Sequence, residues 1–169
     1  LDKHRALQER DLPYFKTLHS LAFNVLGLKK SNVMQPEHYE DIGKKLGIEV
    51  SVYANGQEKT GFVDSDSEYF NIINAARIKE VSVITEYNTG IYSDSIDKRQ
   101  LKILKDEVDN YKQAYGLVDF TDMIAKFNES KLCPNFDVVF VDEAQDLSPI
   151  QWKMFDILKT QSKHIILAG

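Results

Sequence analysis

The sequence has little cysteine and no apolar run long enough to cross a bilayer. Cys133 is the only cysteine among 169 residues, which excludes an intrachain disulfide and a cysteine-cluster metal site. A chain with one thiol suits a reducing compartment, so we expect a cytoplasmic protein. A membrane-spanning helix needs about 20 apolar residues, and the charged start at residues 1–5 is unlike a signal peptide. These absences predict a soluble protein with no membrane contact.

The sequence also lacks an excess of basic charge. Its net charge is -5 and its pI is about 5.4, which argues against a protein that coats nucleic acid through a wholly basic surface. A local basic groove stays compatible with these values. With 43% hydrophobic residues, the chain can bury the core of one domain that carries a modest insertion.

An apolar run that ends in acid is the most informative stretch of the chain. Residues 136–141 lack alternation, which predicts a strand buried on both faces of a parallel sheet. Asp142 and Glu143 follow at the carboxyl edge, where open α/β sheets bind ligands. Asp142 is the candidate magnesium ligand, and Glu143 could accept a proton from an attacking water. The simpler alternative is a polar loop whose carboxylates are solvated or cap the next helix.

A second candidate site precedes the first apolar helix. We predict a helix over residues 1–10, a short strand over residues 14–18, and a helix over residues 19–26 that Gly27 ends. Thr17 or Ser20 could simply cap that helix. The start of a helix also offers unpaired N–H groups and hydroxyls to a phosphate.

The middle of the chain has helical rather than strand character. We predict helices over residues 36–46, 65–83 and 93–115, with connections at 48–61 and 86–92. Four basic residues gather on the third helix, at Lys98, Arg99, Lys102 and Lys105. Nearby acids favour a solvated helix face, with binding to a nucleic-acid backbone as the alternative.

The C-terminal part returns to an alternation of helices and strands. Asp119 can cap a helix, and Ser148 with Pro149 can start another that runs to about residue 159. The largely apolar character of residues 163–167 predicts a second buried strand. Because one helix joins the two strands, we expect them to be parallel neighbours.

Four short segments resemble motifs of the UvrD/Rep-like superfamily-1 helicases. The string Val-Asp-Glu-Ala-Gln-Asp at 141–146 resembles the Walker B box, Asp-Glu-x-Gln-Asp. Residues 17–20 are similar to the Thr-Phe-His-Ser motif, with Leu18 in place of phenylalanine. Residues 119–123 resemble Asp-Phe-x-Asp-Leu, and Ala168-Gly169 resembles the start of motif III.

This resemblance implies an α/β fold: a partial RecA-like (P-loop NTPase) parallel sheet with an inserted, mostly helical subdomain. Residues 1–28 and 116–169 would belong to RecA-like domain 1A, and residues 29–115 to the 1B subdomain. The implied activity is ATP-driven movement along single-stranded DNA, expected to run 3′ to 5′, with unwinding at DNA duplex junctions during repair or replication.

The resemblance also implies roles for six residues. Asp142 would coordinate Mg²⁺, Glu143 would polarise the hydrolytic water, and Gln145 would help couple the ATP site to the DNA site. The DNA-facing residues would be Thr17, His19 and Ser20.

The departures from the family pattern matter as much. No Gly-x-x-x-x-Gly-Lys-Ser/Thr phosphate loop occurs, and the second RecA-like domain with its arginine finger is absent. Both ends of the sequence look cut. We therefore expect a piece of an ATPase that is inactive without the rest of its chain. The alternatives are a non-catalytic nucleic-acid-binding module with a decayed helicase fold, and part of a helicase-nuclease subunit of the AddA/RecB kind.

Overall fold

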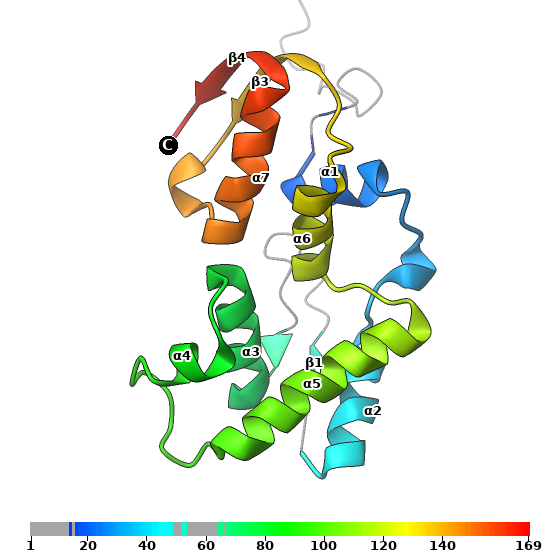
Figure 1. Ribbon diagram of the computed structural model, residues 1–169, viewed down its shortest axis with the longest axis vertical. Helices are drawn as coiled ribbons and strands as arrows, with labels where there is room; N and C mark the ends of the chain where they lie inside the picture. The colour runs from blue at the N-terminus through cyan, green and yellow to red at the C-terminus, as the bar shows by residue number, and fades with distance from the viewer. Residues whose placement is uncertain (1–13, 15, 49–51, 54–63, 66) are drawn as a thin grey trace, which may run out of the picture.

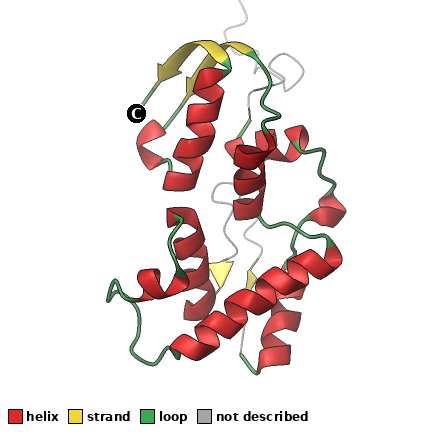
Figure 2. Ribbon diagram, in the orientation of Figure 1, coloured by secondary structure: helices red, strands yellow, loops and turns green. Residues whose placement is uncertain are grey.

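The computed structural model describes residues 14, 16–48, 52–53, 64–65 and 67–169. Its mixture of helices and strands confirms the predicted α/β class, with helix predominating (Figure 2). The described helices and strands gather around two hydrophobic cores, one in each half of the molecule (Figure 1). We call the half that contains the longer strands the sheet unit and the other half the helical lobe.

The sheet unit is built on two parallel strands, as predicted. Strand β3 (Phe136–Val141) pairs with β4 (Ser162–Leu167), and the register places Val141 opposite Leu167. Helix α7 (Pro149–Thr160) joins the two strands. Both strands therefore end at the same edge, and the acids after β3 lie there.

Helices α1 (Leu18–Val25) and α6 (Phe120–Ser130) complete the sheet unit. Helix α6 packs against both α1 and α7. Each of the three helices supplies apolar side chains to one core, whose members with the least exposure are Ala22, Ile124, Phe127 and Met154. The predicted caps Asp119 and Ser148 begin α6 and α7.

The prediction that the strands are buried on both faces was wrong. Phe140 is 73% exposed, and Val138 and Ile166 beside it are also exposed. Val139 and Ile165, which point to the opposite face, are half-buried. The pattern indicates that α7 covers one face of the pair, while no described element covers the other.

In the described residues of the helical lobe, four α-helices surround the second core. They are α2 (Pro36–Leu46), α3 (Glu68–Lys79), α4 (Val83–Tyr87) and α5 (Lys98–Tyr115). A short antiparallel pair, β1 (Val52–Tyr53) and β2 (Asp64–Ser65), adjoins them. A 3₁₀ turn at η1 (Lys30–Asn32) leads the chain into the lobe.

Two predicted helix starts were several residues too early. Helix α3 begins after Ser67 and ends at Glu80, whose left-handed backbone separates it from α4. Ser65, the predicted start of that helix, lies instead in β2 (Asp64–Ser65). Helix α5 begins after Asp97, which accepts hydrogen bonds from the amides of Arg99 and Gln100. Because α4 reaches Tyr87 and α5 begins only at Lys98, the connection predicted over residues 86–92 instead spans residues 88–97.

The short strand predicted over residues 14–18 is not found. Tyr14 lies in a turn, Lys16 in a bend, and Leu18 is the first residue of α1. The apolar side chains are used in packing: the Tyr14 ring meets that of Phe136 edge-on at 5.1 Å. The helix predicted over residues 1–10 lies outside the described residues, as does most of the connection predicted over 48–61.

Candidate functional site

The ends of β3 and β4 are joined by backbone hydrogen bonds. The Ala168 amide donates to the Val141 carbonyl, and the Ala144 amide donates to the Ala168 carbonyl, both at 2.9 Å. The chain then turns through η2 (Ala144–Asp146) before α7 begins. The acids after β3 therefore stand on a loop that the neighbouring strand holds in place.

Asp142 and Glu143 are exposed at this edge. The Asp142 carboxylate accepts a hydrogen bond from the Glu143 amide at 3.1 Å. Glu143 has a left-handed backbone with φ 52°, a conformation that costs free energy for any residue with a side chain. Its carboxylate accepts a hydrogen bond from Gln145 Nε2 at 2.5 Å. The structure thus brings the three candidate residues of this motif together.

Gly169 borders the same group of side chains. A Cβ atom at position 169 would lie 2.0 Å from Gln145 Oε1, so the amide of Gln145 occupies the space that a side chain would need. Sequence reasoning named Gln145 but missed both of these contacts. The spacing of the residues gives no signal for the contact with Gly169, because that contact depends on the alignment of β3 with β4.

The carboxylates do not cap α7. Ser148 and Gln151 cap that helix: the Ser148 amide donates to Gln151 Oε1 at 2.9 Å. The explanation of the acids as helix caps therefore fails for Asp142 and Glu143.

The donors at the edge suit magnesium shared with a phosphate ligand. The described residues contain no cluster of three or more His, Cys, Asp or Glu that could hold a metal alone. Mg²⁺ commonly binds one or two carboxylates and takes its other ligands from waters and substrate phosphates. Exposed carboxylate oxygens at a strand end meet that requirement, with Asp142 as the candidate ligand.

The second candidate group lies at the start of α1. Thr17 Oγ1 accepts a hydrogen bond from the Ser20 amide at 3.2 Å, so Thr17 is the cap. The His19 ring packs edge-on against Phe120 at 5.6 Å. Burial lowers the pKa of His19 below 6.5, so the imidazole is neutral at pH 7. His19 can therefore offer a hydrogen bond but not a positive charge.

The two groups occupy separate elements. Among the described residues, no hydrogen bond or ion pair joins Thr17, His19 or Ser20 to the residues that follow β3. Helix α6 packs against α1 on one side and α7 on the other (Figure 1). Helix α6 therefore offers one route of coupling between the two groups.

The basic residues of α5 are partly used within the lobe. Lys98 Nζ lies 5.0 Å from the centre of the Tyr87 ring, and Lys105 pairs with Asp109 at 3.0 Å. These contacts favour the explanation of a solvated helix face over a basic groove.

Comparisons with known proteins agree with the motifs. The family model described as UvrD/REP helicase N-terminal domain matches residues 4–169. The search of curated proteins found no match, and neither did the search of solved structures. In the described part of the chain, no helix is both long and apolar enough to cross a membrane. The chain therefore belongs, over nearly all of its length, to the UvrD/REP helicase N-terminal domain family.

Proposed function

We propose that this chain is part of an ATP-dependent DNA helicase that couples ATP hydrolysis to movement on single-stranded DNA and to unwinding of duplex junctions. The family match implies a parent protein that uses ATP and binds DNA. One observation carries the proposal: Asp142 and Glu143 stand exposed where two parallel strands end, the edge at which α/β sheets bind ligands. Movement from 3′ to 5′ and a cytoplasmic location are part of this proposal.

Three residues after β3 would act on the nucleotide. Asp142 would hold a magnesium ion, which when bound neutralises charge on the ATP phosphates. Glu143 would take a proton from the attacking water, since its carboxylate is exposed and can approach a ligand. Gln145 would orient Glu143 through the hydrogen bond that it already donates.

Three residues around the start of α1 would face DNA. The hydroxyls of Thr17 and Ser20 and the neutral imidazole of His19 are suited to hydrogen bonds with phosphate and sugar oxygens. Such contacts do not depend on the base sequence of the DNA, and a protein that moves along DNA needs contacts of this kind.

The subdomain assignment is also a proposal. Residues 1–28 and 116–169 would be parts of RecA-like domain 1A, and residues 29–115 the 1B subdomain. Two separate hydrophobic cores support this division. The phosphate loop and the second RecA-like domain would come from the rest of the parent chain, which makes that chain a required partner.

Glu143→Gln in the full-length parent tests the catalytic assignment. The amide keeps the shape but cannot take a proton, so we expect hydrolysis to fall about 10²- to 10⁴-fold. Binding of magnesium-nucleotide should persist, as measured by fluorescence titration. Glu129→Gln, at an exposed position on α6, is the matched control and should retain full hydrolysis. Unchanged hydrolysis in Glu143→Gln would contradict the assignment of Glu143 as the base, whereas a parent that hydrolyses no ATP would favour the non-catalytic nucleic-acid-binding module.

The double substitution His19→Ala with Ser20→Ala tests the DNA assignment in the same parent. We expect basal hydrolysis to stay nearly intact, because neither residue lies in the strand-end group. Stimulation by single-stranded DNA should weaken, together with DNA affinity. Full stimulation and full affinity would mean that residues 17–20 only begin a helix.

A further inference from the structure

The helical lobe is joined to the sheet unit through two adjacent chain segments. The Met34 amide donates to the Val118 carbonyl at 2.9 Å, and the Val118 amide donates to the Asn32 carbonyl at 2.8 Å. Met34 belongs to the core of the lobe and Val118 to the core of the sheet unit. Two narrow segments held by a single bridge would by themselves leave the orientation of the lobe weakly defined.

Four charged side chains meet beside this bridge. Arg77 comes from α3, Lys112 from α5, Asp119 caps α6, and Asp122 lies in its first turn. Arg77 donates to both oxygens of Asp119, at 2.5 and 3.0 Å, and also to Asp122. Lys112 Nζ lies 3.0 Å from Asp119 and 2.9 Å from Asp122. Two cations thus balance two anions, and we call these residues the junction cluster.

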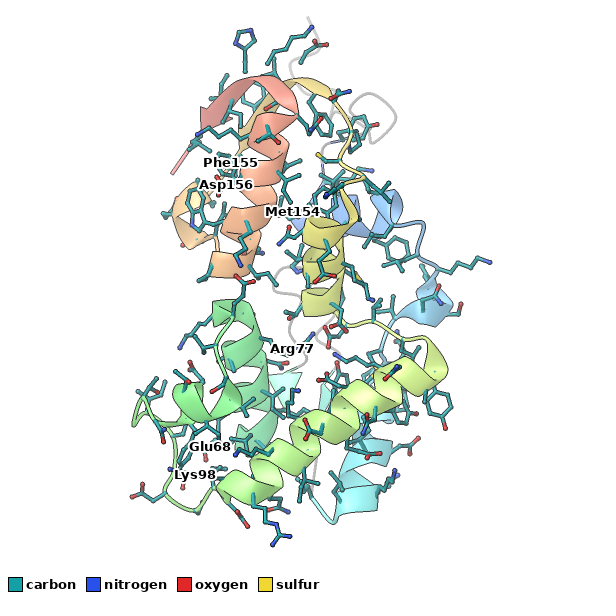
Figure 3. All side chains as sticks on the ribbon, in the orientation of Figure 1. Glu68, Arg77, Lys98, Met154, Phe155 and Asp156 are labelled. Carbon is teal, nitrogen blue, oxygen red and sulfur yellow. The ribbon has the colours of Figure 1, made fainter. Side chains whose placement is uncertain are left out.

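The junction cluster is shielded from water. The side chains of Lys112 and Asp119 are only 7% and 9% exposed. Arg77 extends from α3 toward α5 and α6 (Figure 3). Charges removed from water are costly unless they are paired, so displacement of either helix would leave an unpaired charge behind.

The acids cannot move to follow a displaced lobe. Asp119 accepts a hydrogen bond from the Asp122 amide at 2.8 Å, and Asp122 accepts one from the Asp119 amide at 3.0 Å. These reciprocal bonds begin α6, so any shift of the carboxylates would uncap that helix. The anions are therefore fixed to the sheet unit, and the cations come to them from the lobe.

We propose that Arg77 latches the helical lobe to the start of α6 and so fixes the orientation of the lobe on the sheet unit. Arg77 is 42 residues from Asp119 in sequence, whereas Lys112 is only seven residues away, across the turn at Gly116. In the described part of the chain, a further ion pair between the units joins Lys153 to Glu80 at 2.8 Å, with side chains 61% and 33% exposed. Solvent weakens such a pair, so it cannot replace the junction cluster. The proposal does not depend on the assignments to ATP or DNA.

A matched control exists on the same helix. Lys79 pairs with the buried carboxylate of Glu86 at 2.7 Å, and both residues belong to the lobe. Lys79→Met and Arg77→Met each remove a cation of α3 from a buried carboxylate. Only Arg77→Met breaks a contact between the two units.

The test is a distance measurement by electron spin resonance on the whole 169-residue chain. Spin labels are attached at K102C on α5 and K159C on α7, both exposed positions, in a Cys133→Ala background. We expect one narrow distribution of label-to-label distances in the protein without a substitution at position 77 or 79, and also in Lys79→Met. In Arg77→Met we expect a broadened or shifted distribution. Equal widths in Arg77→Met and Lys79→Met would overturn the proposal.

Amide hydrogen exchange gives a second readout at the bridge. In Arg77→Met the exchange rates of Met34 and Val118 should rise about 10²- to 10³-fold, and more than in Lys79→Met. If Arg77→Met fails to fold, Arg77→Lys is measured in the same two ways. It keeps the charge but loses the two-pronged contact, so partial broadening is expected. A distance distribution in Arg77→Lys as narrow as that of the protein with Arg77 would overturn the proposal that Arg77 latches the lobe.

Discussion

At the scale of single residues, Asp119 combines two roles that its sequence context shows only in part. Its place before Phe120 predicts a helix cap, and the structure confirms that role. The same carboxylate also neutralises Arg77 and Lys112. Burial alone would raise the pKa of Asp119, but the two cations and their hydrogen bonds outweigh burial and hold it well below its usual range.

The low pKa of Asp119 predicts how stability depends on pH. A lowered folded-state pKa stabilises the fold above the unfolded-state value of 3.8, and this contribution is lost as pH falls through the folded-state pKa. Asp119→Asn retains capping ability but leaves the cations short of one anion. We expect a loss of about 3–5 kcal/mol at pH 7 and a flatter acid limb below pH 4 in urea unfolding. Equal slopes in the two proteins would contradict the proposed pairing.

Another residue-scale lesson concerns the acids after β3. The order of residues identified Asp142, Glu143 and Gln145, but not the left-handed backbone of Glu143 or the hydrogen bond from Gln145. Both features belong to the conformation of the loop after β3, which the types and order of its residues did not specify.

At the scale of elements, helix ends were predicted well where glycine provides the stop. Helices α2 and α5 end at residues 46 and 115, as predicted, and are followed by Gly47 and Gly116, both with positive φ. The starts of α3 and α5 were predicted poorly, because several Ser and Asp residues precede each helix and any of them can cap. Tertiary contacts select among them: Tyr69 Oη accepts a hydrogen bond from the Asp97 amide at 3.0 Å.

Helix α6 ends without glycine, which leads to a prediction. Lys131 is exposed and has a left-handed backbone with φ 56°. Lys131→Gly should stabilise the chain by about 0.5–1 kcal/mol, because glycine adopts this conformation without steric cost. The control Lys131→Ala removes the same charge but keeps a Cβ atom, so urea unfolding should show no gain. A gain in Lys131→Ala equal to that in Lys131→Gly would point to charge rather than backbone strain.

The burial of strands β3 and β4, in contrast, was predicted wrongly. Their apolar composition predicted burial on both faces, yet Phe140 and Ile166 are exposed. Composition records the environment for which a strand is suited, whereas exposure depends on which elements cover it. Helix α7 packs on the β3 and β4 pair and covers one of its faces.

At the scale of the whole molecule, the chain carries the strand-end acids without a phosphate loop. A magnesium ligand cannot replace the backbone amides that such a loop directs at the phosphates. We therefore expect the 169-residue chain alone neither to hydrolyse ATP nor to bind it tightly. Phosphate release with and without single-stranded DNA measures this, with Glu143→Gln as the control for background. DNA-stimulated release above that control would contradict the prediction.

The family, the parallel pairing of β3 with β4 and the place of the acids at their common edge could all be predicted from the amino-acid order. Motifs and strand–helix–strand order are formed by residues close together in the sequence. They can therefore be recognised without knowing how the helices pack. The contacts of Arg77 with Asp119 and Asp122, which lie 42 and 45 residues away, could be seen only in the folded chain. Such pairing depends on which faces of α3, α5 and α6 pack together. Other helices also carry basic residues, so the sequence does not indicate which of them pairs with the two acids.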